Sequence, residues 1–184
     1  MLRTAAGFLC LVLLLAPRSL EAQSPEPVRL VSFNLFGPAF GIYNVEFEHS
    51  LSATRSVALS TTWWDTRVGD DEDDLRYLSA DLKARLYARE VLAGFGAAAI
   101  AGWTRIENKR YDGPCRPATG VECTETDNAF TLGMAIDYVL RTGHSRNLTF
   151  ILGFGAKKLF GIGDLSADVS PFYPIARLSI GWAF

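Results

Sequence analysis

The feature of this sequence that most constrains its fold is an alternation of apolar and polar side chains that recurs in long segments. From Leu78 to Leu86 every second residue is Leu or Ala, and the residues between them are Ser, Asp, Lys and Arg. The segments beginning at Tyr43 and Phe130 alternate in the same way. Successive side chains of a β-strand point to opposite faces, whereas a helix would mix the two sets. The pattern therefore predicts a sheet with one apolar face.

Eight segments of the chain carry this pattern, and each is nine to fourteen residues long. They are Val28–Phe36, Gly41–Leu51, Arg55–Asp65, Asp74–Tyr87, Leu92–Arg105, Asn128–Leu140, Asn147–Leu159 and Tyr173–Phe184. Strands of soluble proteins have a mode of about 5 to 6 residues, whereas a tilted strand crosses a bilayer in about 9 to 11. These segments are long enough to cross a membrane.

The connections between these segments alternate in length. Those at 52–54, 88–91 and 141–146 are short, and most of the others are longer, up to the 22 residues of 106–127. Short turns at one end and longer loops at the other are typical of outer-membrane barrels. The fold predicted from the residues is all-β: an eight-stranded antiparallel up-and-down transmembrane barrel.

A soluble lipocalin-like barrel carrying an apolar ligand also has eight alternating strands. The two folds differ in which set of side chains faces the interior: the apolar set in the soluble barrel, and the polar set in the membrane barrel. The polar set includes many glycines and an equal number of charges of each sign, which suits a crowded interior. An eight-stranded barrel is just wide enough for side chains to fill. We therefore predict an interior charge network with no large pore, made of Glu46, Glu48, Asp81, Lys83, Arg85, Asp137, Lys157 and Arg177.

Aromatic residues lie near both ends of the apolar set. Tyr43, Trp63 and Trp103 come near the loop end, and Tyr138, Trp182 and Phe184 near the turn end. Aromatic girdles at the two membrane interfaces have this distribution.

The first 22 residues resemble a secretory signal peptide, with Arg3 before an apolar run from Ala5 to Ala16. That run is shorter than the roughly 20 residues that a spanning helix needs. We expect cleavage near Ala22, which leaves residues 23–184 as the barrel domain. In an oxidising compartment the two remaining cysteines, Cys115 and Cys123, are expected to form a disulfide.

The charge of the chain excludes one class of function. Its 18 basic and 20 acidic side chains give a net charge of −2, which lacks the positive field that a dedicated nucleic-acid binder needs. We expect no cofactor.

The last nine residues, Ala176–Phe184, place Leu178, Ile180, Trp182 and the final Phe184 on one face. This segment resembles the C-terminal assembly signal of Gram-negative outer-membrane barrels. The chain as a whole is similar to barrels of the OmpA/OmpX type, and the segment from Asn34 to His49 is similar to the opening of an uncharacterised outer-membrane barrel family. The resemblance implies a monomeric outer-membrane protein that contacts lipid and lipopolysaccharide, and whose insertion depends on the barrel-assembly machinery.

Two places in the sequence carry residue types that are found in catalytic or cation-binding sites. Glu46, His49 and Ser50 supply the residue types of an acyl-transfer site, but His49 and Ser50 are adjacent and point to opposite faces, so we expect no enzyme. A lipid A-modifying enzyme stays as an alternative. A run of carboxylates in an outer loop could bind a divalent cation or be a solvated loop tip: Asp70, Asp71, Glu72, Asp73 and Asp74. The leading hypothesis is a structural or surface-interaction protein of the outer membrane.

Overall fold

The computed structural model describes residues 29–35, 37–67, 74–110, 123–142, 147–161 and 172–184. The described residues form eight strands and one short 3-10 helix, η1 (Gly37–Phe40). The strands are β1 (Arg29–Asn34), β2 (Ile42–Ser52), β3 (Arg55–Arg67), β4 (Asp74–Tyr87), β5 (Gly94–Arg110), β6 (Cys123–Thr142), β7 (Leu148–Phe160) and β8 (Phe172–Ala183). Among these elements, no helix is long and apolar enough to cross a membrane.

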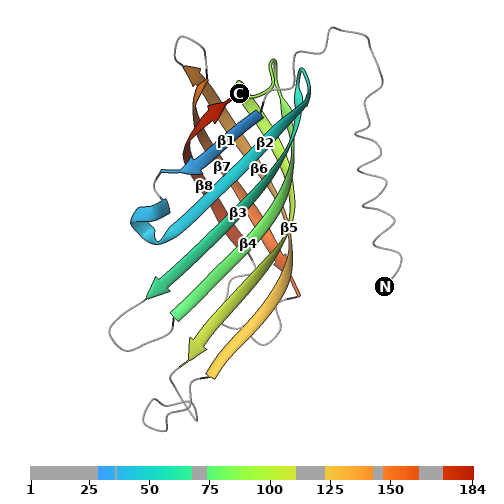
Figure 1. Ribbon diagram of the computed structural model, residues 1–184. Helices are drawn as coiled ribbons and strands as arrows, with labels where there is room; N and C mark the ends of the chain where they lie inside the picture. Colours follow the sequence, from blue (N-terminus) through green and yellow to red (C-terminus); the bar gives the residue numbers. More distant parts are fainter. Residues whose placement is uncertain (1–28, 36, 68–73, 111–122, 143–146, 162–171) are drawn as a thin grey trace, which may run out of the picture.

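The strands close into a barrel in sequence order. Each strand pairs antiparallel with the next, and β1 pairs with β8 to complete the ring. Figure 1 shows the strands tilted against the long axis of the barrel. We call the end of the barrel with the β2–β3, β4–β5 and β6–β7 connections the turn end, and the opposite end the loop end. The predicted all-β antiparallel barrel is confirmed.

Several strand ends differ from the prediction. Strands β5 and β6 continue to Arg110 and from Cys123, beyond the predicted limits of Arg105 and Asn128, and they pair along this whole extension. Apolar alternation ends there, but backbone pairing does not need apolar side chains, so the hairpin continues past the patterned region. At the turn end, β5 begins at Gly94 because Val91 and Leu92 fold into the interior.

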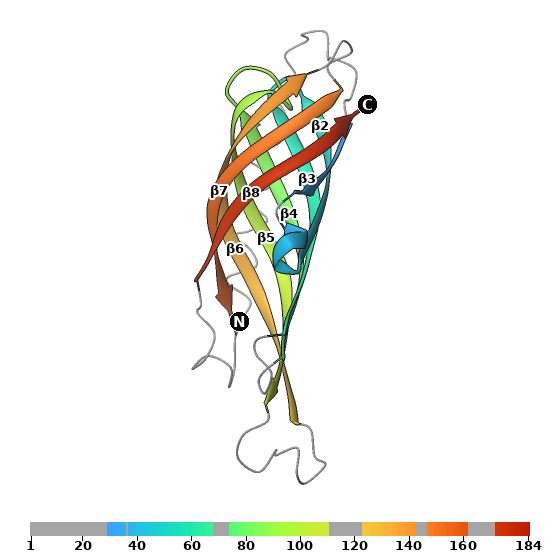
Figure 2. The same ribbon diagram turned by 90° about the vertical axis from the view of Figure 1, so that its left-hand side faces the viewer.

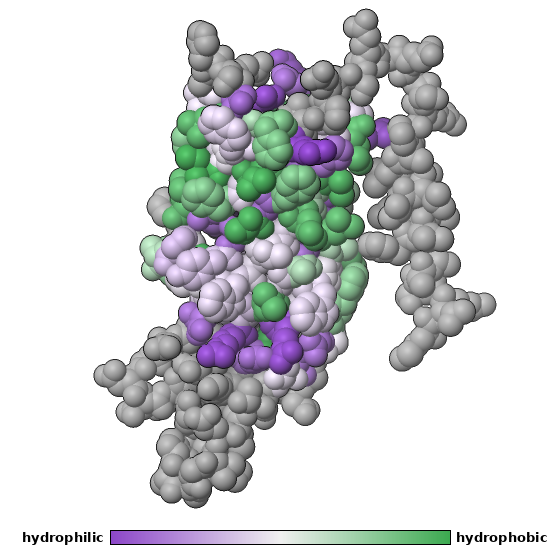
Figure 3. Space-filling view, viewed as in Figure 1, coloured by the Kyte–Doolittle hydropathy of each residue, from purple (hydrophilic) through white to green (hydrophobic). Residues whose placement is uncertain are grey.

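The outward face of the barrel is apolar, whereas its inward face carries buried charged side chains between apolar clusters at its two ends. Along β4, Leu82 is 54% exposed whereas its neighbour Lys83 is 8% exposed. Leu78, Phe130 and Ile136 are likewise exposed. Figure 3 shows on one side of the molecule that apolar side chains cover much of the wall, with polar side chains gathered toward the rims. A soluble carrier of an apolar ligand would have the reverse arrangement.

Candidate functional site in the barrel interior

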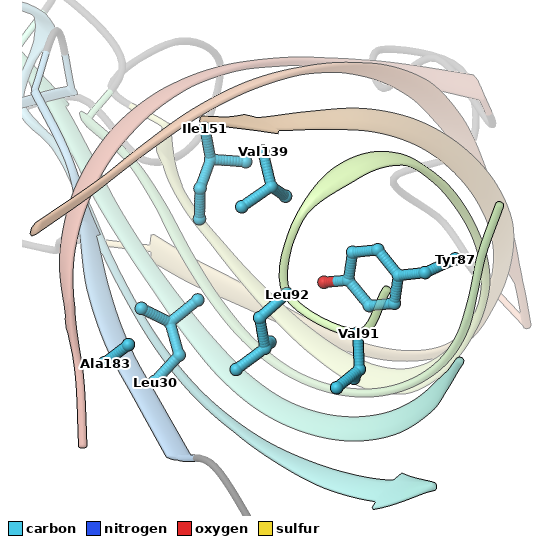
Figure 4. Packing of buried hydrophobic residues seen from close by; sticks show 7 residues of the cluster. All are labelled: Leu30, Tyr87, Val91, Leu92, Val139, Ile151 and Ala183. Atoms are coloured by element: carbon cyan, nitrogen blue, oxygen red, sulfur yellow. The ribbon is translucent and has the colours of Figure 1, made fainter. Parts of the chain in front are cut away.

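The turn end of the interior is filled by an apolar cluster, which we call the plug. It consists of Leu30, Tyr87, Val91, Leu92, Val139, Ile151 and Ala183. Figure 4 shows these side chains pointing toward one another within the barrel. The β4–β5 connection enters the interior here, held by a hydrogen bond of 2.7 Å from the Val91 N–H to the Ala53 carbonyl, and Leu92 takes a φ of 60°. The plug was not predicted from the sequence, where its one signal is the apolar pair Val91 and Leu92 at the boundary between a short turn and the next predicted strand.

Next to the plug lies a cluster of charges centred on Arg85. Its guanidinium forms ion pairs with Glu46 at 2.7 Å, with Asp137 at 2.9 Å, and with Glu48. Glu48 also accepts hydrogen bonds from Tyr87, at 2.7 Å, and from Ser56. Buried charges are tolerated when each is paired and hydrogen-bonded, and this arrangement meets both conditions.

Two further cations complete this cluster. Lys83 Nζ lies 2.6 Å from Glu46 Oε2, and Arg177 Nη1 lies 2.9 Å from Glu46 Oε1. The Arg177 N–H does not point at that oxygen, so the contact is an ion pair and not a hydrogen bond. The other nitrogens of Arg177 donate to Ser32 and Ser179 at 2.8 and 3.0 Å. Glu46 therefore connects β2 with β4 and β8.

A second ion pair lies nearer the loop end. Lys157 Nζ is 3.0 Å from Asp81 Oδ2 and donates a hydrogen bond of 2.9 Å to Ser79. Ser79 and Thr131 in turn donate to Asp81 at 2.9 and 3.2 Å. The structure thus places all eight residues of the expected charge network inside the barrel, in two groups of ion pairs.

Glycines make room for the buried carboxylates. A Cβ at Gly102 would collide with a carboxylate oxygen of Asp81, and a Cβ at Gly153 would collide with one of Asp137. Both glycines lie directly opposite the aspartates in neighbouring strands. These two inward glycines are therefore part of the charge cluster, because a larger residue would displace an acid from its partners.

A cavity of about 300 Å³ lies on the loop side of the charges. Three cations and one acid of the two ion-pair groups reach its wall: Lys83, Lys157, Arg177 and Asp81. Two polar atoms in the same wall, Ser60 Oγ and Trp64 Nε1, have no hydrogen-bond partner, and Ser60 is only 1% exposed. Neither Ser60 nor Trp64 was predicted as a site residue. A single inward serine looks like any other polar position of an alternating strand, and Trp64 looks like one more aromatic residue of a strand.

An aromatic and aliphatic cluster lies beyond the cavity, toward the loop end. Tyr77, Ile106, Ala129 and Leu159 are buried there, and Trp64 and Tyr173 pack against them. The rings of Tyr77 and Tyr173 have centroids 5.7 Å apart. The charged middle of the interior is thus bordered by apolar side chains at both ends.

The remaining candidate residues lie elsewhere. Leu178, Ile180, Trp182 and Phe184 are partly or fully exposed, and they alternate with the inward Arg177, Ser179, Gly181 and Ala183. His49 is half-buried and Ser50 is buried on the opposite face, so the structure does not bring them together as a catalytic pair.

Two predictions concern residues outside those described. Asp70, Asp71, Glu72 and Asp73 of the acidic loop are among them, and Asp74 is the first residue of β4. Cys115 and the side chain of Cys123 also lie outside the described set, so the disulfide stays a prediction. Among the described residues, no group of three or more His, Cys, Asp or Glu side chains could hold a metal ion.

Comparison with known proteins supports the fold. No protein-family model and no curated protein matches the chain. Among solved structures, the N-terminal β-barrel domain of Pseudomonas aeruginosa OprF matches with a TM-score of 0.51 at 14% identity, over 88% of this chain and 100% of that one. Neisserial surface protein A matches with a TM-score of 0.49 at 10% identity, over 85% and 92%. Ail, the attachment invasion locus protein of Yersinia pestis, matches with a TM-score of 0.48 at 10% identity, over 86% and 96%. The chain is thus an eight-stranded antiparallel closed barrel, similar in fold to the OprF barrel, a small barrel of the Gram-negative outer membrane.

Proposed function

We propose that this chain is an integral protein of the bacterial outer membrane with a structural or surface-interaction role, and that its interior has no large pore. The observation that carries the proposal is the direction of the two faces: large apolar side chains lie outside on all eight strands, and the paired charges lie inside. In hydrocarbon every backbone N–H and C=O must be paired within the protein, and a sheet can achieve this only by closing.

The aromatic residues support a position across a bilayer. Tyr43 and Trp63 stack at 5.7 Å near the loop end, and both are half exposed. Phe95 and Tyr138 make an edge contact at 4.8 Å near the turn end. Trp and Tyr favour the boundary between lipid and water, so these pairs would mark the two interfaces.

The filled turn end supports a barrel that does not conduct. A solute entering from the loop side would meet the Arg85 cluster and then the plug, and both are buried. Removing a charge from its partners to open a path would leave an unpaired buried ion, which costs several kcal/mol. Planar-bilayer recordings are expected to show no stable conductance.

The same proposal extends to export and assembly. Residues 1–22 would be removed on export, and the outward Phe184 and Trp182 would be read by the barrel-assembly machinery in the periplasm. The mature monomer would then contact lipid and lipopolysaccharide, with its longer connections facing outward to recognise partners. We propose no enzymatic activity: lipid A mass spectra are expected to be identical in cells that express the wild type and His49→Ala.

One experiment separates this proposal from a soluble barrel. The full chain is expressed in a Gram-negative host, the membranes are fractionated, and the purified protein is run on gels before and after boiling. We expect outer-membrane localisation, a need for detergent, and faster migration of the unboiled barrel. A protein that is soluble without detergent would overturn the proposal.

A further inference from the structure

Strand β1 closes the barrel against β8 along only part of the length of β8. Strand β1 pairs with β8 between Asn34↔Ser179 and Leu30↔Ala183. The Leu35 N–H also donates to the Leu178 carbonyl at 2.8 Å, and Arg29 and Phe184 exchange two backbone hydrogen bonds of 2.7 and 2.8 Å at the turn end. Strand β8, however, begins at Phe172. Among the described residues, the β1-facing edge of β8 from 172 to 177 therefore has no strand beside it.

Pro174 lies on this open edge. The Leu178 and Phe184 carbonyls accept hydrogen bonds from β1, whereas the Ala183 N–H is bonded on the β7 side. The pairing of β7 with β8 has no register shift, so the even-numbered residues from 172 onward present their backbone groups to the gap. Proline has no N–H to donate and occurs in sheets mainly on edges. Pro174 therefore leaves one fewer unpaired N–H on this edge than any other residue would.

The β1–β2 connection lies beside the gap. It contains η1, whose Gly37 lies so close to Ile42 that a Cβ there would collide with the Ile42 carbonyl. Phe40 of the same turn is 69% exposed. Figure 2 looks onto this side of the barrel and shows η1 beneath the end of β1, next to β8.

The 300 Å³ cavity reaches this gap. Its wall includes Asn34, Ile42 and Asn44 on the β1–β2 side, and Pro174 and Ala176 on the β8 side. Pro174 and Ala176 are exposed on the outward face of β8, while most of the wall is made of inward residues. The cavity therefore extends from the interior to the gap between β1 and β8, next to side chains that would face lipid.

The wall of the cavity is rich in donors. Ser60 Oγ and Trp64 Nε1 have no partner, and an indole N–H can only donate. Three cations, each in an ion pair with Glu46 or Asp81, and a single carboxylate reach the wall as well. Ile42, Pro174 and Ile175 give the part nearest the gap an apolar surface. An occupant with oxygen acceptors at one end and an apolar chain at the other would satisfy both parts.

We propose that this cavity is a binding site, entered sideways from the membrane, for a single-chain amphiphile with an anionic head, either a carboxylate or a phosphate. The head lies beside Ser60, Trp64 and Lys157, and the chain leaves the barrel between η1 and β8. A volume of about 300 Å³ holds roughly ten waters at about 30 Å³ each, which is room for a head and a few carbons. The rest of the chain stays in the bilayer, so the site rests on the proposed membrane location.

Quenching of Trp64 fluorescence tests the site. Trp63, Trp103 and Trp182, which all face outward, are changed to Phe so that Trp64 is the sole tryptophan of the chain. The detergent-purified protein is titrated with α-bromododecanoate, whose bromine lies beside the carboxylate. We expect saturable quenching that dodecanoate and dodecyl phosphate reverse, and that neutral dodecanol does not. The relative strength of the two anions identifies the source of the head.

Two variants and one matched control locate the binding. Ala176→Phe narrows the gap and Ser60→Leu fills the head site, and each is expected to weaken binding about tenfold or more, which corresponds to about 1.4 kcal/mol. Ala99→Phe adds the same ring to an exposed alanine of β5 that does not line the cavity, and it should bind like the parent. Unboiled gel migration verifies that each variant is folded.

Three results would overturn the proposal: no saturable quenching, equal competition by dodecanol, or unchanged affinity in both folded cavity variants. Fractionation of the parent protein tests membrane location separately. A detergent-dependent barrel that fails to bind would overturn the site alone, whereas a soluble barrel would overturn the membrane assignment whatever it binds.

Discussion

The two halves of the barrel interior are built from the same kinds of residue, but one is packed and the other is hollow. In the turn-end half, Arg85 contacts three carboxylates and the plug fills the remaining space. In the loop-end half, Ser60 and Trp64 leave polar atoms without partners beside a cavity. The difference shows that alternation of small and polar inward residues does not by itself fill a barrel.

Two features account for the difference. The turn-end half receives side chains from a connection, since Val91 and Leu92 enter from the β4–β5 turn. It also has a complete wall, because β1 lies between β2 and β8 there. Among the described residues, β1 does not continue along the loop-end half of β8, so it contributes no inward side chain there beyond Asn34.

The largest effect is expected at the centre of the packed half. Arg85→Met removes the one cation that contacts Glu46, Glu48 and Asp137 together, and should lower the free energy of unfolding by about 3 to 5 kcal/mol, because buried carboxylates lose their partner. Urea unfolding in detergent, followed by gel migration, measures the change. Arg76→Met, in an exposed ion pair at 3.6 Å, is the control and should cost under about 1 kcal/mol. Similar losses in both variants would contradict the comparison.

The next largest loss of stability is expected when a side chain of the plug is shortened. Leu92 is fully buried, so Leu92→Ala is expected to lower the free energy of unfolding by about 3 kcal/mol, through lost contacts and the cavity that it leaves. Leu86→Ala on the outward face is the control, since detergent or lipid chains can occupy the vacated space. The same urea titration compares the two, and an equal loss would mean that Leu92 does not pack as a core residue in solution.

At the border of the two halves, Lys157→Met should be less costly than Arg85→Met, at about 1 to 3 kcal/mol. Asp81 keeps hydrogen bonds from Ser79 and Thr131 and lies in the cavity wall, where water can reach it. A second change, Asp81→Asn, should restore part of the loss, because it removes the unpaired charge. A double variant less stable than Lys157→Met would contradict this reading of the pair.

The smallest effect is expected at Ser60, and the comparison is sharpest against Ser56, because these two serines of β3 differ in their partners. The Ser56 hydroxyl donates to buried Glu48, so Ser56→Ala should cost about 1.5 to 3 kcal/mol as a lost hydrogen bond to a charged group. The Ser60 hydroxyl has no partner, so Ser60→Ala should change stability by less than about 0.5 kcal/mol. Parallel urea titrations measure both, and a large loss at Ser60 would show that its hydroxyl is bonded in solution.

Most of the fold follows from the sequence, because alternation is a local property of the chain. In β4 the residues from Leu78 to Leu86 identify the strand, its length and its two faces. The extension of β5 to Arg110 was not predictable in this way, because pairing continues where the apolar pattern has ended. The inward path of Leu92 also escaped prediction: the alternating pattern predicts it as the first residue of a strand, and an apolar residue at a strand boundary does not reveal which way it points.

The sequence by itself determined the strands, their apolar outward face and the identity of the eight inward charges, because the alternation of side chains along a strand can be read from the order of the residues alone. Only the tertiary structure decided which charges meet: Glu46 contacts Lys83, Arg85 and Arg177 through side chains brought together by closure of the ring. It also decided that β1 ends at Asn34, so that no strand among the described residues lies beside Pro174. Both depend on strand register, which joins residues far apart in the chain and leaves no local trace in the pattern.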